Sequence, residues 1–198
     1  MTDSRLVLAS KSPRRRELLR QLDITYDCVS IDVDESLRDG ESAIDFVRRL
    51  AMEKAHTGWQ IQKTELARPT LGADTIVVVD GAILGKPRGK DDALRMMSIL
   101  SGRTHQVMSA VAMVANDSAL RLSISEVGMR STTDAEREAY WDSGEPADKA
   151  GAYAIQGLAA MFVERLHGSY SGVMGLPLFE TVDLLSRFSI YPPLMKPI

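Results

Sequence analysis

The chain has 198 residues, of which 44% are apolar and 26% charged, as expected for a globular protein with a sizeable core. Its net charge of −3 argues against a nucleic-acid binder, whose surface would be strongly basic. The only cysteine, Cys28, excludes an internal disulfide, and its apolar neighbours predict a small core residue. Without a signal peptide or an apolar run of roughly 20 residues, we expect one compact cytoplasmic unit with no membrane contact.

An apolar strand at Arg5–Ala9 leads into the first predicted helix. Ser12 suits its N-cap and Pro13 its first position. The first turn then carries Arg14–Arg16, although the positive end of a helix disfavours each cation by about 0.3–1 kcal/mol unless an anion is present. Free N–H groups, serine hydroxyls and cations together are the parts of a phosphate site. The alternative is a basic surface cluster that binds nothing specific.

A second short strand around Tyr26–Ser30 is followed by an acidic turn, Ile31–Ser36. This turn is either a solvated loop or a source of ligands for a hard cation such as Mg²⁺. Ser42 then caps a helix that extends to about Gly58, and the apolar stripe of that helix continues at Lys54. A lysine on the inward face either extends to solvent at the helix end or contacts a phosphate or a catalytic carboxylate.

A buried strand is predicted at Ile76–Val79, where β-branched residues follow one another without interruption. The dipeptide Asp80-Gly81 is typical of a tight hairpin, so Ala82–Leu84 is the predicted return strand. This pairing places Asp74, at the mouth of the buried strand, and Lys86 together at one end of the sheet. The alternatives are that Asp74 caps a turn and that Lys86 is a solvated end residue.

A helix and a long hairpin follow. Either Asp91 or Asp92 is the predicted N-cap of the helix. Strands at His105–Val114 and Leu120–Arg130 form an antiparallel pair. Because His105 opens a strand, we interpret it as structural rather than as a base.

The last third of the chain contains a polar loop between regular elements. A capping box at Thr133–Glu136 starts a helix. The segment Asp148–Gly157 has neither helical nor strand periodicity, and such a loop more often carries binding than packing. A strand near Ala160–Leu166, a glycine-rich link at Gly168–Gly175 and a helix that begins at Pro177 complete the predicted elements.

Five blocks of sequence together resemble the Maf family of nucleotide pyrophosphatases. They are Ser10-x-Ser12-Pro13-Arg14-Arg15, Glu53-Lys54-Ala55, Gly72-Ala73-Asp74-Thr75, Gly85-Lys86-Pro87, and Asp148-Lys149-Ala150-Gly151 with Ile155-Gln156-Gly157. The resemblance covers almost the whole chain in order, and only the segment after Phe188 falls outside it. It implies an α/β fold with a mixed sheet, flanking helices and two lobes around a central cleft, related to the inosine-triphosphate pyrophosphatases. It also implies one domain over residues 1–198, with a loose C-terminal tail at residues 190–198.

The activity implied by this resemblance is metal-dependent hydrolysis of a nucleoside triphosphate to the monophosphate and pyrophosphate. Asp74 matches the proton acceptor of the family. The positions that distinguish the dTTP/UTP branch from the branch acting on 7-methyl-GTP are matched by Arg14, Thr75 and Gln156. Further functional positions of the cleft are matched by Ser10, Arg15, Glu35, Lys54 and Lys86. Around Glu35 the acids Asp32 and Asp34 leave the register of the turn open by about one residue.

Attack of water on the α-phosphorus needs a base, a metal ion and cations that stabilise the leaving pyrophosphate. In this interpretation Asp74 is the base or a metal-associated carboxylate, and Glu35 is a ligand of Mg²⁺ or Mn²⁺. The cations around the triphosphate are Arg14, Arg15, Lys54 and Lys86, and the two lysines belong with Asp74 to the catalytic group. The expected substrates are dTTP, UTP and modified pyrimidine triphosphates.

The base-reading residue is expected to be Gln156. Uracil and thymine present an acceptor, a donor and an acceptor, and a glutamine amide can pair twice with that edge. Guanine presents two adjacent donors, which suit a carboxylate instead.

Two other functions remain open. The family's association with inhibition of septum formation suggests a regulatory protein that senses the nucleotide without significant turnover. A nucleic-acid-binding module that uses Lys11–Arg16 is disfavoured by the negative net charge and by the lack of interleaved aromatic residues. The sequence also leaves a homodimer open.

Overall fold

The computed structural model describes residues 5–62 and 67–195. Within these ranges the chain forms a mixed seven-stranded sheet in the order β2-β1-β3-β5-β6-β7, with β4 also paired to β3. The strands are β1 Leu6–Ala9, β2 Tyr26–Val29, β3 Thr70–Val79, β4 Ala82–Leu84, β5 Thr104–Val114, β6 Ser118–Met129 and β7 Val163–His167. β1 pairs in parallel with β2 and β3, whereas the other pairings are antiparallel. The α/β architecture predicted from the sequence is confirmed.

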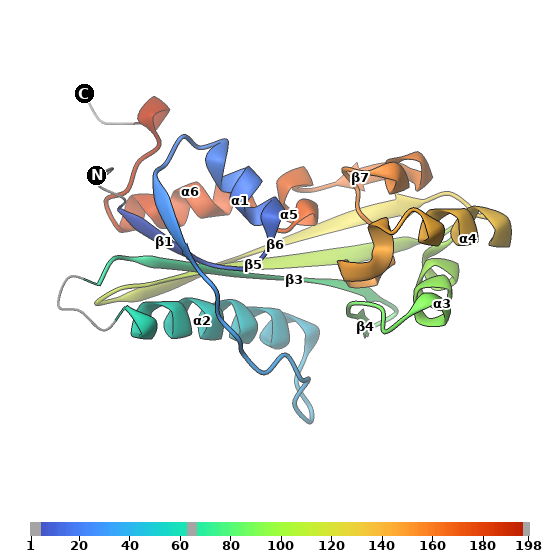
Figure 1. Ribbon diagram of the computed structural model, residues 1–198, viewed down its shortest axis with the longest axis horizontal. Helices are drawn as coiled ribbons and strands as arrows, with labels where there is room; N and C mark the ends of the chain where they lie inside the picture. The colour runs from blue at the N-terminus through green and yellow to red at the C-terminus, as the bar shows by residue number, and fades with distance from the viewer. Residues whose placement is uncertain (1–4, 63–66, 196–198) are drawn as a thin grey trace.

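Helices cover both faces of the sheet. They are α1 Pro13–Arg20, α2 Ala43–Ile61, α3 Lys90–Leu100, α4 Asp134–Asp142, α5 Tyr170–Met174 and α6 Leu178–Arg187. Figure 1 shows α2 against one face, α1 and α6 against the other, and α3 and α4 at the far end of the long strands. Each of these three groups of helices packs on its own cluster of buried apolar side chains. Among the described residues, no helix has the length and apolar character needed to cross a membrane.

The sheet is open on one edge of β3, and this opening divides the fold into two lobes. Along one edge β3 pairs with β5 from Thr70 to Val78. Along the other edge it pairs with β1 only at Thr70 and Leu71, and with β4 only from Val77 to Val79. Residues 72–76 therefore pair with neither β1 nor β4 along that edge. The long strands β3, β5 and β6 run through both lobes and hold them together (Figure 1).

Local sequence signals placed several element boundaries correctly. The Ser12 and Ser42 hydroxyls cap α1 and α2 by accepting the N–H groups of Arg15 and Asp45. Thr133 and Glu136 form the predicted capping box at the start of α4. Asp80 and Gly81 close the β3–β4 hairpin with φ angles of 49° and 78°, as a two-residue turn of this type requires.

The prediction for the start of the central strand was wrong. β3 begins at Thr70 rather than near Ile76, so Asp74 lies in the middle of the strand and not at its mouth. The reason is tertiary pairing, because residues before Asp74 bond to β5 and, at Thr70 and Leu71, to β1. Asp74 is thus no turn cap.

Three further predictions were wrong. Cys28 is exposed rather than in the core, because β2 is an edge strand. Neither Asp91 nor Asp92 is the N-cap of α3, which begins after Gly89, although Asp92 accepts the N–H of Arg88 at 3.1 Å. The last strand begins at Val163, because the residues before it, Leu158–Phe162, form a 3₁₀ helix.

The C-terminal part of the chain adds one helix that the sequence did not indicate. The glycine-rich link contains α5, whose N-cap is Ser169. In the segment predicted as a loose tail, Ile190 is buried and Leu194 is exposed, and residues 196–198 lie outside the described ranges.

Candidate functional site

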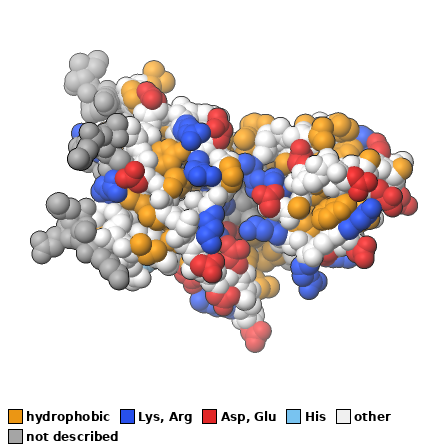
Figure 2. Space-filling view, in the orientation of Figure 1, with side chains coloured by type: hydrophobic (Ala, Val, Ile, Leu, Met, Phe, Trp, Pro, Cys, Tyr) orange, Lys and Arg blue, Asp and Glu red, His pale blue; other side chains and the backbone are white. Residues whose placement is uncertain are grey.

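A cleft of about 790 Å³ opens at the unpaired edge of β3. It is lined by six cationic side chains and four carboxylates, an excess of two positive charges in a chain whose net charge is −3. The cations are Lys11, Arg14, Arg15, Lys54, Lys86 and Lys149. Figure 2 shows Lys and Arg side chains gathered around the hollow between the two lobes. All nine site residues predicted from the sequence line this cleft.

A buried lysine joins two carboxylates on the floor of the cleft. The Nζ atom of Lys54 donates to Oδ1 of Asp74 and to Oε1 of Glu35, at 2.6 Å in each case. Lys54 and Asp74 are only 7% and 6% exposed, and charges at that depth require partners. Lys54 therefore contacts carboxylates, and the alternative in which it extends to solvent is excluded.

The close approach of α2 to β3 depends on Gly72. A Cβ atom at this position would lie 2.5 Å from the carbonyl oxygen of Ala51 and would also overlap the backbone at Ala55. With no side chain between them, helix and strand come close enough for Lys54 to reach Asp74, two residues further along the same face of β3. The Lys54–Asp74 ion pair thus depends on the close backbone packing of α2 on β3 as well as on charge.

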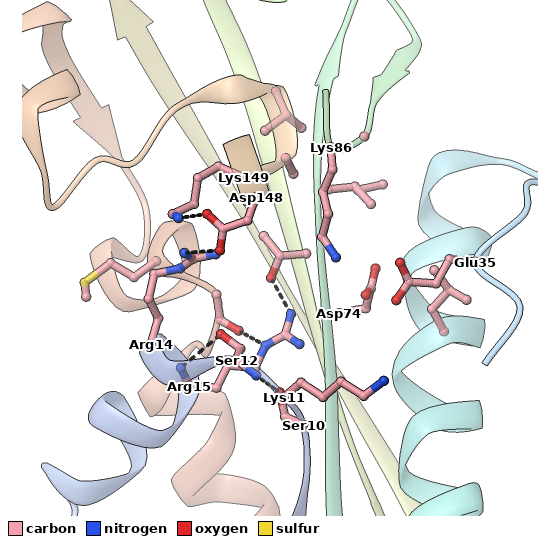
Figure 3. Close-up of a pocket in the computed structure, with 18 of the residues that line it drawn as sticks. Ser10, Lys11, Ser12, Arg14, Arg15, Glu35, Asp74, Lys86, Asp148 and Lys149 are labelled. Carbon is pink, nitrogen blue, oxygen red and sulfur yellow. Dashed lines mark hydrogen bonds and ion pairs between the residues drawn. The ribbon is translucent and has the colours of Figure 1, made fainter. Parts of the chain in front are cut away.

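Glu35 is the member of the acidic turn that faces the cleft floor. Asp34 instead accepts the N–H of Ser36 at 2.9 Å, and Asp32 lies 3.8 Å from Lys11 on the surface. Burial opposes ionisation of Glu35, but the hydrogen bond from Lys54 and the nearby cations outweigh it and lower its pKa. Figure 3 shows the carboxylates of Glu35 and Asp74 facing each other, with Lys86 directed towards them. Within residues 5–62 and 67–195, no group of three or more acidic, His or Cys side chains could hold a metal ion.

The first turn of α1 forms the opposite wall. Arg15 donates from Nε to the carbonyl oxygen of Gly175 at 2.8 Å and from Nη2 to Oγ1 of Thr75 at 3.5 Å. Arg14 lies 3.6 Å from Asp148 across the cleft. Burial lowers the pKa of both arginines, and the helix has no acidic residue in its first turn. Ser10 is buried beside them, and its hydroxyl accepts the N–H of Ser12 at 3.1 Å.

A buried serine that sequence reasoning missed holds Thr75 in place. Ser109 on β5 lies opposite Thr75 and donates its hydroxyl proton to the carbonyl oxygen of Gly172 at 2.6 Å. The Ser109 oxygen therefore accepts from Thr75, at 2.8 Å. The Thr75 oxygen remains free to accept from Arg15. The glycine-rich link supplies two carbonyl oxygens to this wall, from Gly172 in α5 and from Gly175 directly after it, but the sequence carries no signal for Ser109 itself.

The remaining predicted residues are exposed side chains of the cleft lining. Lys86 follows β4 and is exposed in the cleft. Gln156 is exposed in the loop after α4, and in the described part of the chain its side chain has no hydrogen-bond partner. Lys149, another lining residue that was not predicted, contacts Asp148, and burial lowers its pKa.

Comparison with known proteins identifies the family. Residues 5–188 match the family described as Maf-like protein. The chain belongs to the Maf family. This Maf protein is 53% identical over 188 residues to a dTTP/UTP pyrophosphatase of Alkalilimnicola ehrlichii, with 93% of each chain covered. It is 50% identical over 194 residues to a dTTP/UTP pyrophosphatase of Chromobacterium violaceum, with 96% of this chain and 98% of the relative covered.

Among solved structures, a nucleoside-triphosphatase/dITP/XTP pyrophosphatase from Mycobacterium abscessus overlaps 63% of this Maf protein and 72% of its own chain. The TM-score is 0.39 and the identity 18%, values too low to support an argument about function.

Proposed function

We propose that this protein hydrolyses dTTP and UTP, together with modified pyrimidine triphosphates, to the monophosphate and pyrophosphate. The observation that carries the proposal is a single cleft in which Asp74, paired with Lys54, lies opposite a helix N-terminus that bears two arginines. The choice of nucleotide is supported by relatives of about half-identical sequence that are named dTTP/UTP pyrophosphatase.

The charges of the cleft suit a triphosphate. Arg14 and Arg15 project from the first turn of α1, where the backbone N–H groups and the helix dipole favour an anion. Lys86 and Lys149 reach the same space from the other lobe (Figure 3). Burial lowers the pKa of Arg14, Arg15 and Lys149, as expected for cations held away from water. A bound triphosphate would neutralise them.

Hydrolysis requires a base beside the α-phosphorus. In the proposed reaction Asp74 takes a proton from the attacking water, and Lys54 holds the carboxylate in position. A bond forms between the water oxygen and the α-phosphorus, while the bond from that phosphorus to the bridging oxygen breaks. The electron pair leaves with pyrophosphate, whose charge Arg15 and Lys86 stabilise.

The acidic residues of the floor fit a divalent cation such as Mg²⁺ or Mn²⁺. Lys54 bonds one oxygen of each carboxylate, Oε1 of Glu35 and Oδ1 of Asp74, and the second oxygen of each is left for a cation. Mg²⁺ commonly takes one or two carboxylates from the protein and phosphate oxygens from the substrate. Glu35 and Asp74 are therefore the residues that would hold the ion. When bound, it would neutralise charge on the phosphate oxygens.

Gln156 is the proposed reader of the base. Its free amide can accept the ring N–H of uracil or thymine and donate to a carbonyl oxygen of the base. Cytosine has nearly the same size but no N–H at that ring position. Because a buried polar group without a partner costs about 1–3 kcal/mol, this contact can favour UTP over CTP by roughly tenfold to a hundredfold.

A panel of nucleoside triphosphates tests the proposal. Pyrophosphate release is measured for UTP, dTTP, CTP, ATP, GTP and modified pyrimidine triphosphates, with Mg²⁺, with Mn²⁺ and with a chelator. We expect the highest kcat/KM with UTP and dTTP, and loss of turnover with the chelator. Equal kcat/KM for CTP and UTP would contradict the assignment of Gln156. Tight binding of UTP without pyrophosphate release would instead favour a nucleotide sensor.

A further inference from the structure

The turn that carries Gln156 is held from both sides by two side chains outside the cleft. Gly157 N–H bonds to the carbonyl oxygen of Ala154 at 3.0 Å, so Gln156 is the third residue of a tight turn. The N–H of Ala154, at the start of this turn, donates to the hydroxyl of Tyr140 at 3.1 Å. After the turn, Leu158 N–H donates to Oε2 of Glu145 at 3.0 Å. Neither Tyr140 nor Glu145 lines the cleft.

The two side chains form one unit. The Tyr140 hydroxyl donates to Oε1 of Glu145 at 2.7 Å, which leaves its oxygen free to accept from Ala154. Tyr140 is 4% exposed, and its ring packs edge to face on Phe162. Glu145 also accepts the N–H of Ala159 at 3.4 Å. A tyrosine from α4 and a carboxylate thus satisfy backbone donors on both sides of Gln156.

Gly157 shows how closely this unit contacts the turn. A Cβ atom at position 157 would overlap the carboxylate of Glu145. The backbone φ of Gly157 is −111°, outside the left-handed region that favours glycine, so a side chain here would conflict chiefly with the carboxylate, which would have to move. The residue directly after Gln156 is therefore packed against Glu145.

We propose that Tyr140 and Glu145 are positioning residues that fix the turn of Gln156 and thereby set the preference for a uracil or thymine edge over cytosine. This inference rests on the proposed function. A glutamine side chain has three rotatable bonds and has no partner of its own within the described residues, so its backbone must be held for the amide to meet the base in one geometry.

The test compares UTP with CTP in the full-length protein. Tyr140→Phe keeps the ring on Phe162 but removes the hydroxyl, so Ala154 N–H and Glu145 lose their shared partner. We expect the ratio of kcat/KM for UTP to that for CTP to fall about tenfold. The ratio is informative because partial unfolding lowers both values equally and leaves the ratio unchanged. Glu145→Gln is a second variant. Three groups donate to the Glu145 carboxylate, namely the Tyr140 hydroxyl and the N–H groups of Leu158 and Ala159, and the NH₂ group of glutamine would face at least one of them.

Two controls separate positioning from general damage. Glu138→Gln changes an exposed carboxylate of α4 and should keep the wild-type ratio. In a Gln156→Ala background, Tyr140→Phe should leave the already reduced ratio unchanged, because the amide through which it acts is absent.

The outcomes distinguish the two proposals. A wild-type protein that shows no preference for UTP over CTP contradicts the proposed function and this inference with it. A wild-type preference that both Tyr140→Phe and Glu145→Gln retain overturns the inference alone. A fall in the ratio that is equally large without Gln156 also overturns it, because the effect would then not pass through that residue.

Discussion

Lys54 on α2 and Asp74 on β3 meet in a buried ion pair of 2.6 Å because no side chain separates the helix from the strand at Gly72. The same lysine reaches Glu35, so the position of α2 sets the spacing of both carboxylates. The distance between one helix and one strand thus controls the geometry of the proposed catalytic group.

Gly72→Ala tests this dependence. The added methyl group would contact Ala51 and Ala55, and α2 must move away from β3 to accommodate it. Overpacking of this kind costs about 1–3 kcal/mol of unfolding free energy. Because Lys54 moves with the helix, we expect kcat/KM for UTP to fall by about tenfold to a hundredfold. Gly89→Ala is the matched control, since a Cβ atom there meets nothing within 4 Å. Wild-type activity in Gly72→Ala would show that α2 does not set the pair.

Arg15→Ala tests the phosphate role of α1. In the empty protein two effects oppose each other, because the variant loses the bond to Gly175 but also removes a half-buried cation from a helix N-terminus. We therefore expect little change in Tm without nucleotide. A non-hydrolysable UTP analogue at about 100 times its Kd should stabilise wild type by about 2.7 kcal/mol, and Arg15→Ala should lose most of that shift.

Arg16→Ala is the control for this experiment. Arg16 lies in the same turn but does not line the cleft, so its variant should keep the wild-type shift. An unchanged shift in Arg15→Ala would show that Arg15 does not bind the nucleotide.

His105 predicts a pH dependence of stability. It is 2% exposed, bonds to the hydroxyl of Tyr153 at 2.7 Å, and burial lowers its pKa from 6.5 to about 4. Between these values the unfolded chain takes up a proton that the folded protein does not. The unfolding free energy should therefore decrease as the pH falls from 6.5 to 4, by on the order of 3 kcal/mol from this residue.

Denaturant unfolding at several pH values measures this contribution. His105→Gln should show a weaker dependence on pH over this range than wild type. His56→Gln, which changes an exposed histidine of α2, should retain the wild-type dependence. Identical pH dependence in wild type and His105→Gln would contradict the lowered pKa.

Three helix starts and the tight hairpin could be predicted because their causes are local. Ser12, Ser42 and Thr133 each accept an N–H three residues ahead, and Asp80-Gly81 adopts the angles of its turn without help from other elements. The inward lysine, Lys54, was visible as a break in an apolar stripe.

Features that depend on partners distant in sequence could not be predicted. The true start of β3 at Thr70 follows from pairing with β1 and β5, and the exposure of Cys28 follows from the position of β2 at an edge. Ser109 is an ordinary strand residue in the sequence, and only its register opposite Thr75 brings it to the site. The Maf resemblance supplied site residues, but not these supporting contacts.

The most direct test of the central claim is the turnover of Asp74→Asn with saturating UTP, measured as pyrophosphate release beside the Kd for a non-hydrolysable analogue. If Asp74 accepts the proton of the attacking water, kcat should fall by about 10² or more while folding and nucleotide binding are kept. Asp80→Asn, at the exposed turn after the same strand, should retain wild-type kcat. An Asp74→Asn protein with more than half of the wild-type kcat would contradict the account.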